Sequence, residues 1–340
     1  MTSLRVGILG ASGYTGAELL RLCAQHPSFD VVMATGDTQA GVRAASLYPS
    51  LAARYPDLVF SEFDPASASG LDVVFLGLPH EASLSLAPQL VGQVGVVVDL
   101  SAAYRLQDAS LYPEWYGFTH DQPELLSKAV YGLPERHRSA LVGASLVATR
   151  GCHVTAATIA LAPLVDAGCI ERTGVVVNSI TGISGAGRGL KHTSLFCTAN
   201  EDVNAYGLLH HRHTPEIEQE VGAQVLFTPH LAPMNRGILS TCYARPAADV
   251  STASLMQVLR DAYAGEPFVV VTDESPSTKA TLGSNSAHVT VRFDERTGTV
   301  LALCAIDNLA KGASGGAVQA ANVAVGLPET AGLSSVGVYP

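Results

Sequence analysis

The sequence predicts an α/β fold in which an N-terminal, doubly wound parallel sheet is followed by an α+β domain with a mixed sheet. Three observations support this prediction. A strand, a glycine-rich turn and a helix open the chain, strands and helices then alternate to about residue 148, and after residue 174 strands predominate. With 340 residues, 47% of them hydrophobic and 15% charged, the chain can form the cores of two domains.

The first predicted element is an apolar strand at Leu4–Leu9, followed by a glycine-rich turn and a helix over 17–25. Glycines let the backbone approach a pyrophosphate closely, and the positive end of the helix dipole stabilises its charge. This order is typical of a Rossmann domain, although the spacing G-x-x-G-x-x-G differs from the commoner G-x-G-x-x-G. We expect a dinucleotide to contact seven consecutive residues, Gly10, Ala11, Ser12, Gly13, Tyr14, Thr15 and Gly16.

Further strands are predicted at 30–35, 72–78 and 94–100, with a helix at 81–91. Ligands of a doubly wound sheet bind beyond the carboxyl ends of its strands. The residues at the ends of these strands and just beyond them therefore line the predicted cleft. They are Thr35, Asp37, Thr38, Pro79 and His80, which we expect near the cofactor, and Ser101. For His80, capping of the next helix is an equal alternative.

Asp37 bears on the choice between NAD and NADP. An acidic residue about 20 positions beyond the glycines usually holds the ribose 2′-hydroxyl and favours NAD. Its neighbours Thr35, Thr38, Gln39 and Arg43 could instead hold a 2′-phosphate. Taken alone, the residues lean slightly towards NAD.

Cys152 is predicted to be a nucleophile. It follows the apolar run 140–147 and precedes a helix predicted through Leu164. At such a position, unpaired backbone N–H groups and the helix dipole favour the thiolate, and cysteine pKa values fall from about 8.5 to roughly 3.5–7.5. A buried structural cysteine is the alternative.

Two loops of the second domain carry further candidates. The loop 182–189 follows a predicted strand at 174–181 and is rich in glycine, so its backbone N–H groups could hold an anion, with Arg188 as an additional donor. A mere flexible loop is the alternative. The second loop contains three histidines, at 210, 211 and 213, just before a helix for which Thr214 is the expected N-cap.

One of these histidines is expected to act as acid/base for Cys152, and Glu216 could orient its imidazole. Incidental histidines in a surface turn are the alternative. We expect no metal, because no carboxylate or cysteine stands at a familiar ligand spacing from the histidines.

The remaining strands of the mixed sheet are predicted at 240–245, 268–272, 287–293 and 300–306, with a hairpin turn at 294–298. Helices are predicted at 251–264 and 315–325. We divide the chain into a nucleotide-binding domain, 1–148, to which a C-terminal segment at about 311–340 returns, and a catalytic domain, 149–310.

Composition and charge exclude several classes of protein. A net charge of −10 and a pI of about 5.5 argue against a general nucleic-acid or membrane-surface binder, because both need a basic face. No apolar run approaches the length of a membrane span, and we expect no signal peptide. The six cysteines form no metal or disulfide pattern, which fits a reducing cytoplasm.

Taken together, the motifs resemble the N-acetyl-gamma-glutamyl-phosphate reductases of arginine biosynthesis over nearly the whole chain. The wider fold class also contains aspartate-semialdehyde dehydrogenase and glyceraldehyde-phosphate dehydrogenase. The blocks that carry the resemblance are Gly10–Gly16, Asp99–Ser101 with Arg105, Tyr131–Glu135, Gly151–Cys152, Ser184–Arg188, His211–Ile217, Thr228–Gly237 and Asp307–Gly312.

The resemblance implies an NADPH-dependent reductive dephosphorylation. Cys152 would displace phosphate from an acyl phosphate to form a thioester, hydride would reduce it, and His211 would protonate the developing oxyanion. Ser101, Arg105 and His213 align with substrate or phosphate contacts, and the implied oligomer is a dimer or tetramer. We add Ser184, Arg188 and Arg236 as anion contacts, and assign Ser184, Gly185, Asn308 and Lys311 to the cofactor.

The chain departs from the family pattern beside the nucleophile. Arg150 and His153 stand where the family usually has proline and an aromatic residue, and both could supply positive charge there. The family's usual arginine is also missing near Thr35–Thr38, but we still follow the family in expecting NADP rather than NAD.

Two rival functions remain open. One is a lysine-biosynthesis reductase that acts on an aminoadipyl or glutamyl phosphate tethered to an acidic carrier protein, which would favour a basic rim. The other is a nucleotide-sensing protein without catalysis, which would have no use for Cys152 beside a histidine.

Overall fold

The computed structural model describes residues 3–340, which form two compact units. The first unit runs up to Arg150 and includes Ala313–Leu333, and the second comprises Gly151–Gly312 and Ser334–Pro340. The C-terminal segment, predicted to return to the first domain over about 311–340, is thus divided between the units. The last residues stay with the second unit because the Asn285 N–H donates to the Ser334 carbonyl and the Val338 N–H to the Leu282 carbonyl, each at 2.8 Å.

The first unit contains a six-stranded sheet of order β2-β1-β3-β4-β6-β5, in which every pair is parallel. The strands are β1 (Leu4–Leu9), β2 (Phe29–Ala34), β3 (Val73–Leu76), β4 (Val96–Asp99), β5 (Val130–Tyr131) and β6 (Leu146–Ala148). The helices are α1 (Tyr14–Cys23), α2 (Ala44–Leu47), α3 (His80–Leu90), α4 (Tyr112–Tyr116), α5 (Pro123–Leu126), α6 (Pro134–Leu141) and α11 (Gly315–Ala324). The predicted parallel sheet is confirmed.

The order of this sheet reverses direction at β1, which lies between β2 and β3. Ligands of such sheets bind in the crevice where the strand order reverses. The glycine-rich turn follows β1, and Pro79 and His80 follow β3, so both segments lie at this crevice. Topology therefore places two of the predicted cofactor segments together.

The second unit contains a seven-stranded sheet of order β11-β12-β13-β10-β7-β9-β8. The β7/β9 and β11/β12 pairs are parallel and the others antiparallel, so the predicted mixed sheet is confirmed. The strands are β7 (Val175–Gly182), β8 (Asn204–Ala205), β9 (Val225–Ala232), β10 (Ile238–Ala244), β11 (Val269–Val271), β12 (Ala287–Asp294) and β13 (Thr299–Ile306). The helices are α7 (Cys152–Asp166), α8 (Phe196–Ala199), α9 (His213–Val221) and α10 (Thr252–Ala262).

Two local predictions in this unit differ from the structure. Strand β9 was not predicted, because Pro229 and Pro233 argue against a strand. Its outer neighbour is the edge strand β8, which has only two residues and pairs with β9 at His230 and Leu231. A proline is tolerated in such a strand because most of its outer side needs no N–H donor. Helix α9 begins at His213, and its N-cap is Arg212 rather than Thr214. The Thr214 N–H donates to the His211 carbonyl, so Thr214 already lies within the first turn.

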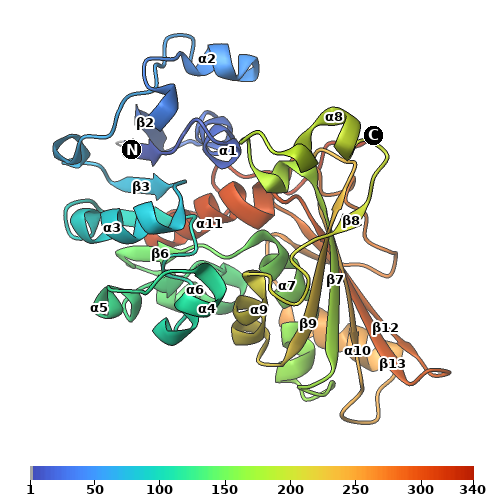
Figure 1. The fold of residues 1–340 in the computed structure, drawn as a ribbon. Coiled ribbons are helices and arrows are strands. Elements are labelled where there is room, and N and C mark those ends of the chain that lie inside the picture. Colours follow the sequence, from blue (N-terminus) through green and yellow to red (C-terminus); the bar gives the residue numbers. More distant parts are fainter. Residues whose placement is uncertain (1–2) are drawn as a thin grey trace. The chain divides into compact units, whose positions relative to one another are not determined.

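The core of the second unit fixes helix α7. Thirteen of its fifteen residues are buried, from His153 through Val165. Helices α7, α9 and α10 pack beside the long strands of the sheet (Figure 1). Alternate strand residues such as Val175, Val177 and Val289 face this core. In residues 3–340, none of the helices has both the length and the apolar character needed to cross a bilayer.

Candidate active site

Cys152 is the first residue of α7, as the sequence predicted, and its side chain is partly buried. The preceding Gly151 is the N-cap, and no side chain caps the helix. The first turn of α7 contains no acidic residue of its own, and the sulfur lies at the positive end of the helix dipole. A Cβ at Gly312 would lie 2.9 Å from the Cys152 Cβ, so glycine is required where the two backbones approach.

Helix α9 holds the backbone just before the nucleophile. The Gly151 N–H donates to the Glu216 Oε1 at 2.8 Å, and this carboxylate is fully buried. A Cβ at Gly151 would lie 2.5 Å from the His213 Nε2, so the imidazole of His213 rests directly on the glycine. This hydrogen bond positions the nucleophile loop, and the orientation of a histidine by Glu216 stays a prediction.

His211 lies beside this arrangement. The centroids of the His211 and His213 rings are 4.8 Å apart, and the His213 N–H donates to the His211 Nδ1 at 3.1 Å. Burial is the main cause that lowers the pKa of His211 to about 4, and the positive charge of Arg212 is the second. The imidazole is therefore neutral at pH 7, and because its Nδ1 accepts a hydrogen bond, its proton lies on Nε2.

His153 is buried behind His211. Its Nδ1 is 2.7 Å from the Ser179 Oγ, and its Nε2 is 3.1 Å from the Tyr206 hydroxyl. Burial, and next the charge of His211, lower its pKa to about 3. His153 is thus neutral at pH 7, and the expectation that it supplies positive charge beside Cys152 is wrong.

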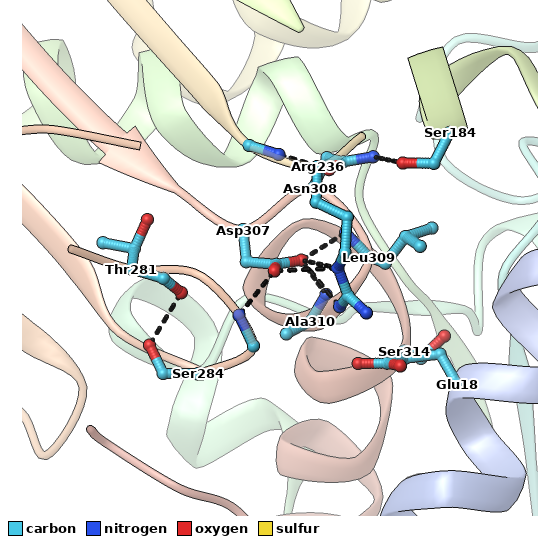
Figure 2. A network of polar contacts seen from close by, with 12 residues as sticks. Glu18, Ser184, Arg236, Thr281, Ser284, Asp307, Asn308, Leu309, Ala310 and Ser314 are labelled. Carbon is cyan, nitrogen blue, oxygen red and sulfur yellow. Dashed lines mark hydrogen bonds and ion pairs between the residues drawn. The ribbon is translucent and has the colours of Figure 1, made fainter. Parts of the chain in front are cut away.

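An ion pair organises the end of strand β13. The buried Asp307 carboxylate accepts hydrogen bonds from the Arg236 Nε at 2.9 Å and its Nη2 at 2.9 Å. It also accepts from the N–H groups of Gly283, Leu309 and Ala310, and Figure 2 shows these contacts converging on one carboxylate. Arg236 was predicted to bind a substrate anion, but its guanidinium already forms a bidentate pair.

Asn308 joins two loops of the second unit. Its Nδ2 donates to the Ser184 Oγ at 2.9 Å, and its Oδ1 accepts from the Gly237 N–H at 2.7 Å. These contacts fix Ser184 at the start of the glycine-rich loop (Figure 2). Gly185 and Arg188 are both exposed in that loop.

Lys311, which we assigned to the cofactor, is fully buried. Its ammonium lies 5.4 Å from the centre of the Phe268 ring, a cation–π distance. These surroundings are those of a core residue in the second unit.

In the first unit, the glycine-rich turn leaves no room for side chains at two positions. Gly10 has φ +82°, and a Cβ there would lie 2.3 Å from the Gly77 carbonyl oxygen. A Cβ at Gly16 would lie 2.4 Å from the Ala11 Cα. No side chain caps α1, and its first turn contains no acidic residue. This turn therefore presents backbone to a ligand at the positive end of a helix, which suits a pyrophosphate.

The other predicted cofactor residues of this unit divide into two groups. Thr35 is buried and its hydroxyl accepts from the Gly10 N–H at 3.2 Å, so it supports the turn. The His80 Nδ1 accepts from the Ala102 N–H at 3.0 Å, so it holds the loop after β4. Asp37 and Thr38, in contrast, are exposed after β2, with Asp37 at φ +46°.

Two residues assigned to the substrate are engaged in the fold. The Ser101 hydroxyl donates to the buried Asp99 carboxylate at 2.8 Å and accepts from the Ala103 N–H at 3.0 Å. The Arg105 side chain is buried, and it donates to the Thr149 carbonyl at 2.6 Å and to the Leu100 carbonyl at 2.8 Å.

Arg150 is likewise buried. Its Nη1 donates to the Gly132 carbonyl at 2.6 Å, and a Cβ at Gly316 would lie 1.8 Å from its Nη2. The guanidinium therefore packs against the start of α11 within the first unit.

Sequence reasoning gave no role to Tyr206, Ser179 or Asp307. Asp307 carries a usable signal, because an acidic residue directly follows an apolar strand. Ser179 and Tyr206 carry no such signal, because each contacts His153 from a distant part of the sequence, 26 positions away for Ser179 and 53 for Tyr206.

Comparison with known proteins places this arrangement in a family. Residues 5–144 match the family described as "Semialdehyde dehydrogenase, NAD binding domain", and residues 152–308 match "Semialdehyde dehydrogenase, dimerisation domain". The N-acetyl-gamma-glutamyl-phosphate reductase of Symbiobacterium thermophilum is 47% identical, with 99% of this chain and all of that protein covered. The chain belongs to the N-acetyl-gamma-glutamyl-phosphate reductase family. The family member of Geobacter sulfurreducens is 46% identical over the same share of both chains.

Solved structures agree on the fold. Aspartate-semialdehyde dehydrogenase II of Vibrio cholerae superposes with a TM-score of 0.71, covering 95% of this chain and 98% of that one at 16% identity. A probable aspartate-semialdehyde dehydrogenase of Pseudomonas aeruginosa gives a TM-score of 0.68 at 19% identity, with the same coverage. The family resemblance inferred from the motifs is thus confirmed, and so is the nicotinamide-binding fold class.

Proposed function

We propose that this protein reduces N-acetyl-gamma-glutamyl phosphate to N-acetylglutamate semialdehyde with NADPH, in arginine biosynthesis. The observation that carries the proposal is the position of Cys152 at the uncapped N-terminus of α7, with a neutral His211 among the side chains gathered there. The relatives at 44–47% identity bear the name of this activity.

The Cys152 thiolate would attack the carbonyl carbon of the acyl phosphate. A carbon–sulfur bond forms, the carbon–oxygen bond to phosphate breaks, and the released phosphate takes up from solvent the proton that Cys152 lost on ionising, giving HPO₄²⁻. Thioester formation divides a difficult reduction into two easier steps, because phosphate is a good leaving group and a thioester accepts hydride better than a carboxylate.

A bound reduced nicotinamide supplies the hydride for the thioester carbon. The carbonyl oxygen then carries negative charge until the carbon–sulfur bond breaks and releases the aldehyde and the thiolate. His211, whose proton lies on Nε2, would donate a hydrogen bond to this oxygen and stabilise the charge. Collapse of the alkoxide itself requires no protonation, so a neutral imidazole is sufficient for this role.

The backbone from Gly10 to Gly16 would hold the pyrophosphate of the cofactor, since side chains are excluded there at Gly10 and Gly16. For the ribose, Asp37 and Thr38 are exposed at the end of β2, and Arg43 is an exposed cation nearby in sequence. We propose NADPH over NADH on the family resemblance, with Arg43 as the group that would face a 2′-phosphate.

Arg188 is our candidate for the anionic groups of the substrate, because it is exposed in a loop rich in backbone donors. Ser184 begins the same loop and is held by Asn308. The buried Arg105 and the paired Arg236 would act by shaping the surrounding loops rather than by free charge.

We also propose that the protein is a homo-oligomer. One face of the second sheet packs on α7, α9 and α10, whereas the opposite face carries half-buried or exposed apolar side chains, among them Leu226 and Tyr243 at 50% and 38% exposure. The description of the matching family as a dimerisation domain supports this face as the contact. The free thiols of all six cysteines support a cytoplasmic location.

Steady-state kinetics in the reverse direction test the function, with N-acetylglutamate semialdehyde, phosphate and either NADP or NAD. We expect turnover with NADP that Cys152→Ser abolishes while nucleotide binding persists. His211→Asn should lower the rate by roughly 10²–10³, the cost of removing one hydrogen-bond donor to the oxyanion. Absence of turnover by the wild-type enzyme with either nucleotide would overturn the proposal.

A further inference from the structure

Four side chains form a continuous hydrogen-bonded chain beside the active site. The Ser240 Oγ lies 2.9 Å from the Ser179 Oγ, which lies 2.7 Å from the His153 Nδ1. On its other side, the His153 Nε2 lies 3.1 Å from the Tyr206 hydroxyl. The chain runs from two adjacent strands, β10 and β7, through α7 to the loop that precedes the catalytic histidine.

The inner end of this hydrogen-bonded chain, formed by Ser179 and Ser240, is built into the sheet. Ser179 and Ser240 are both fully buried and lie directly opposite each other in the β7/β10 register. Hydroxyl groups at buried strand positions are costly unless they are hydrogen-bonded, and each of these is bonded to the other. The anchor for His153 is therefore part of the sheet itself.

His153 joins this anchor to Tyr206 as a neutral ring. One of its nitrogens must donate and the other accept, so its bonds to Ser179 and Tyr206 have only two consistent arrangements. In either arrangement, both ring nitrogens are occupied, and the ring orientation is fixed by a partner on each side.

The outer end of the chain touches the catalytic histidine. The Tyr206 and His211 ring centroids are 5.5 Å apart at 70°, and those of His153 and His211 are 6.1 Å apart at 86°. Phe227 closes the group, 5.2 Å from His211 and 5.5 Å from His153. Together with His213 at 4.8 Å, these edge-to-face distances place His211 against four rings, and the hydrogen-bonded side chains hold two of them, His153 and Tyr206, in place.

We propose that His153 is a positioning residue: anchored on Ser179 and Ser240, it holds the Tyr206 hydroxyl and thereby fixes the ring wall against which His211 packs. This inference rests on the proposed function, in which His211 stabilises the oxyanion. An aromatic residue at position 153 could fill the same space, but a purely hydrocarbon ring could not hold Tyr206 by a hydrogen bond.

Two amide variants separate this role from simple packing. The amide of asparagine replaces the Nδ1 of histidine, so His153→Asn keeps the bond to Ser179 and loses the bond to Tyr206. The longer His153→Gln replaces Nε2, so it keeps the bond to Tyr206. Both place an amide in the same buried position, and each is therefore the control for the other.

We expect His153→Gln to retain kcat within about 3-fold of the wild type, and His153→Asn to lower it by about 10-fold, the size of one hydrogen bond. KM and the nucleotide Kd should be unchanged in both. Tyr206→Phe should lower kcat by about 3- to 10-fold in the wild-type background, but cause no further loss in His153→Asn.

Equal kcat values for the two amide variants, or a Tyr206→Phe effect that is the same in both backgrounds, would overturn the inference. If His153→Asn does not fold, Tyr206→Phe is compared in the wild type and in His153→Gln, because both keep the hydrogen bond to Tyr206. We expect Tyr206→Phe to lower kcat in both backgrounds; wild-type kcat for Tyr206→Phe would contradict the proposal. Wild-type turnover in the same assay separates failure of this inference from failure of the proposed function.

Discussion

Lowering the pH from 7 to 5 should strongly reduce the free energy of unfolding, because His153 binds a proton in the unfolded chain but not in the folded protein. Burial lowers the pKa of this histidine to about 3 in the folded protein, against about 6.5 in the unfolded chain. Between these values the unfolded chain binds a proton that the folded protein does not, so stability falls as the pH decreases. Linkage gives a loss of about 2 kcal/mol between pH 7 and pH 5 from this residue.

Urea denaturation at pH 7, 6 and 5 measures this loss. Because other groups titrate in the same range, the wild type is compared with His153→Gln, which removes this titration. We expect the variant to lose about 2 kcal/mol less than the wild type between pH 7 and pH 5, whatever its stability at pH 7. His192→Gln, at an exposed histidine, is the control and should follow the wild type. Equal losses for the wild type and His153→Gln would refute the reasoning.

Three further outcomes are expected. Asp307→Asn should lower the free energy of unfolding by about 3 kcal/mol because it breaks the ion pair with Arg236, and a loss below about 1 kcal/mol in urea titrations would contradict this. Gly16→Ala should weaken NADPH binding by at least about tenfold, since its Cβ would lie 2.4 Å from backbone; a wild-type Kd by fluorescence would count against it. Gly151→Ala should lower kcat by about 100-fold by displacing His213, and steady-state assays showing an unchanged kcat would exclude that effect.

The sequence was most informative where a function depends on neighbouring residues. A strand, glycines and a helix in that order predicted the turn at Gly10–Gly16, which the structure shows at the end of β1. A helix following Cys152 was also predicted, and α7 begins at this residue. In both cases, the spacing of glycine and apolar residues is itself the cause of the local structure.

The sequence was least informative about which side chains carry free charge. Arg236 and Ser101 belong to residue types that bind phosphate, yet Arg236 is paired with Asp307, 71 positions away, and Ser101 is bonded to Asp99. Glu216 also makes a contact that motif spacing does not show, because its carboxylate accepts from the Gly151 N–H, 65 positions away. Motif spacing does not show whether a polar side chain faces a ligand or another part of the chain.

The sequence by itself determined the parallel sheet with its glycine turn, the mixed sheet and the cysteine at a helix N-terminus, because these follow from periodicity and from residues adjacent in the chain. Tertiary structure alone decided the protonation states of His153 and His211 and the partners of the buried charges. Burial and contacts between distant segments set those properties, since removing water from an ionisable group changes its pKa more than any sequence neighbour does.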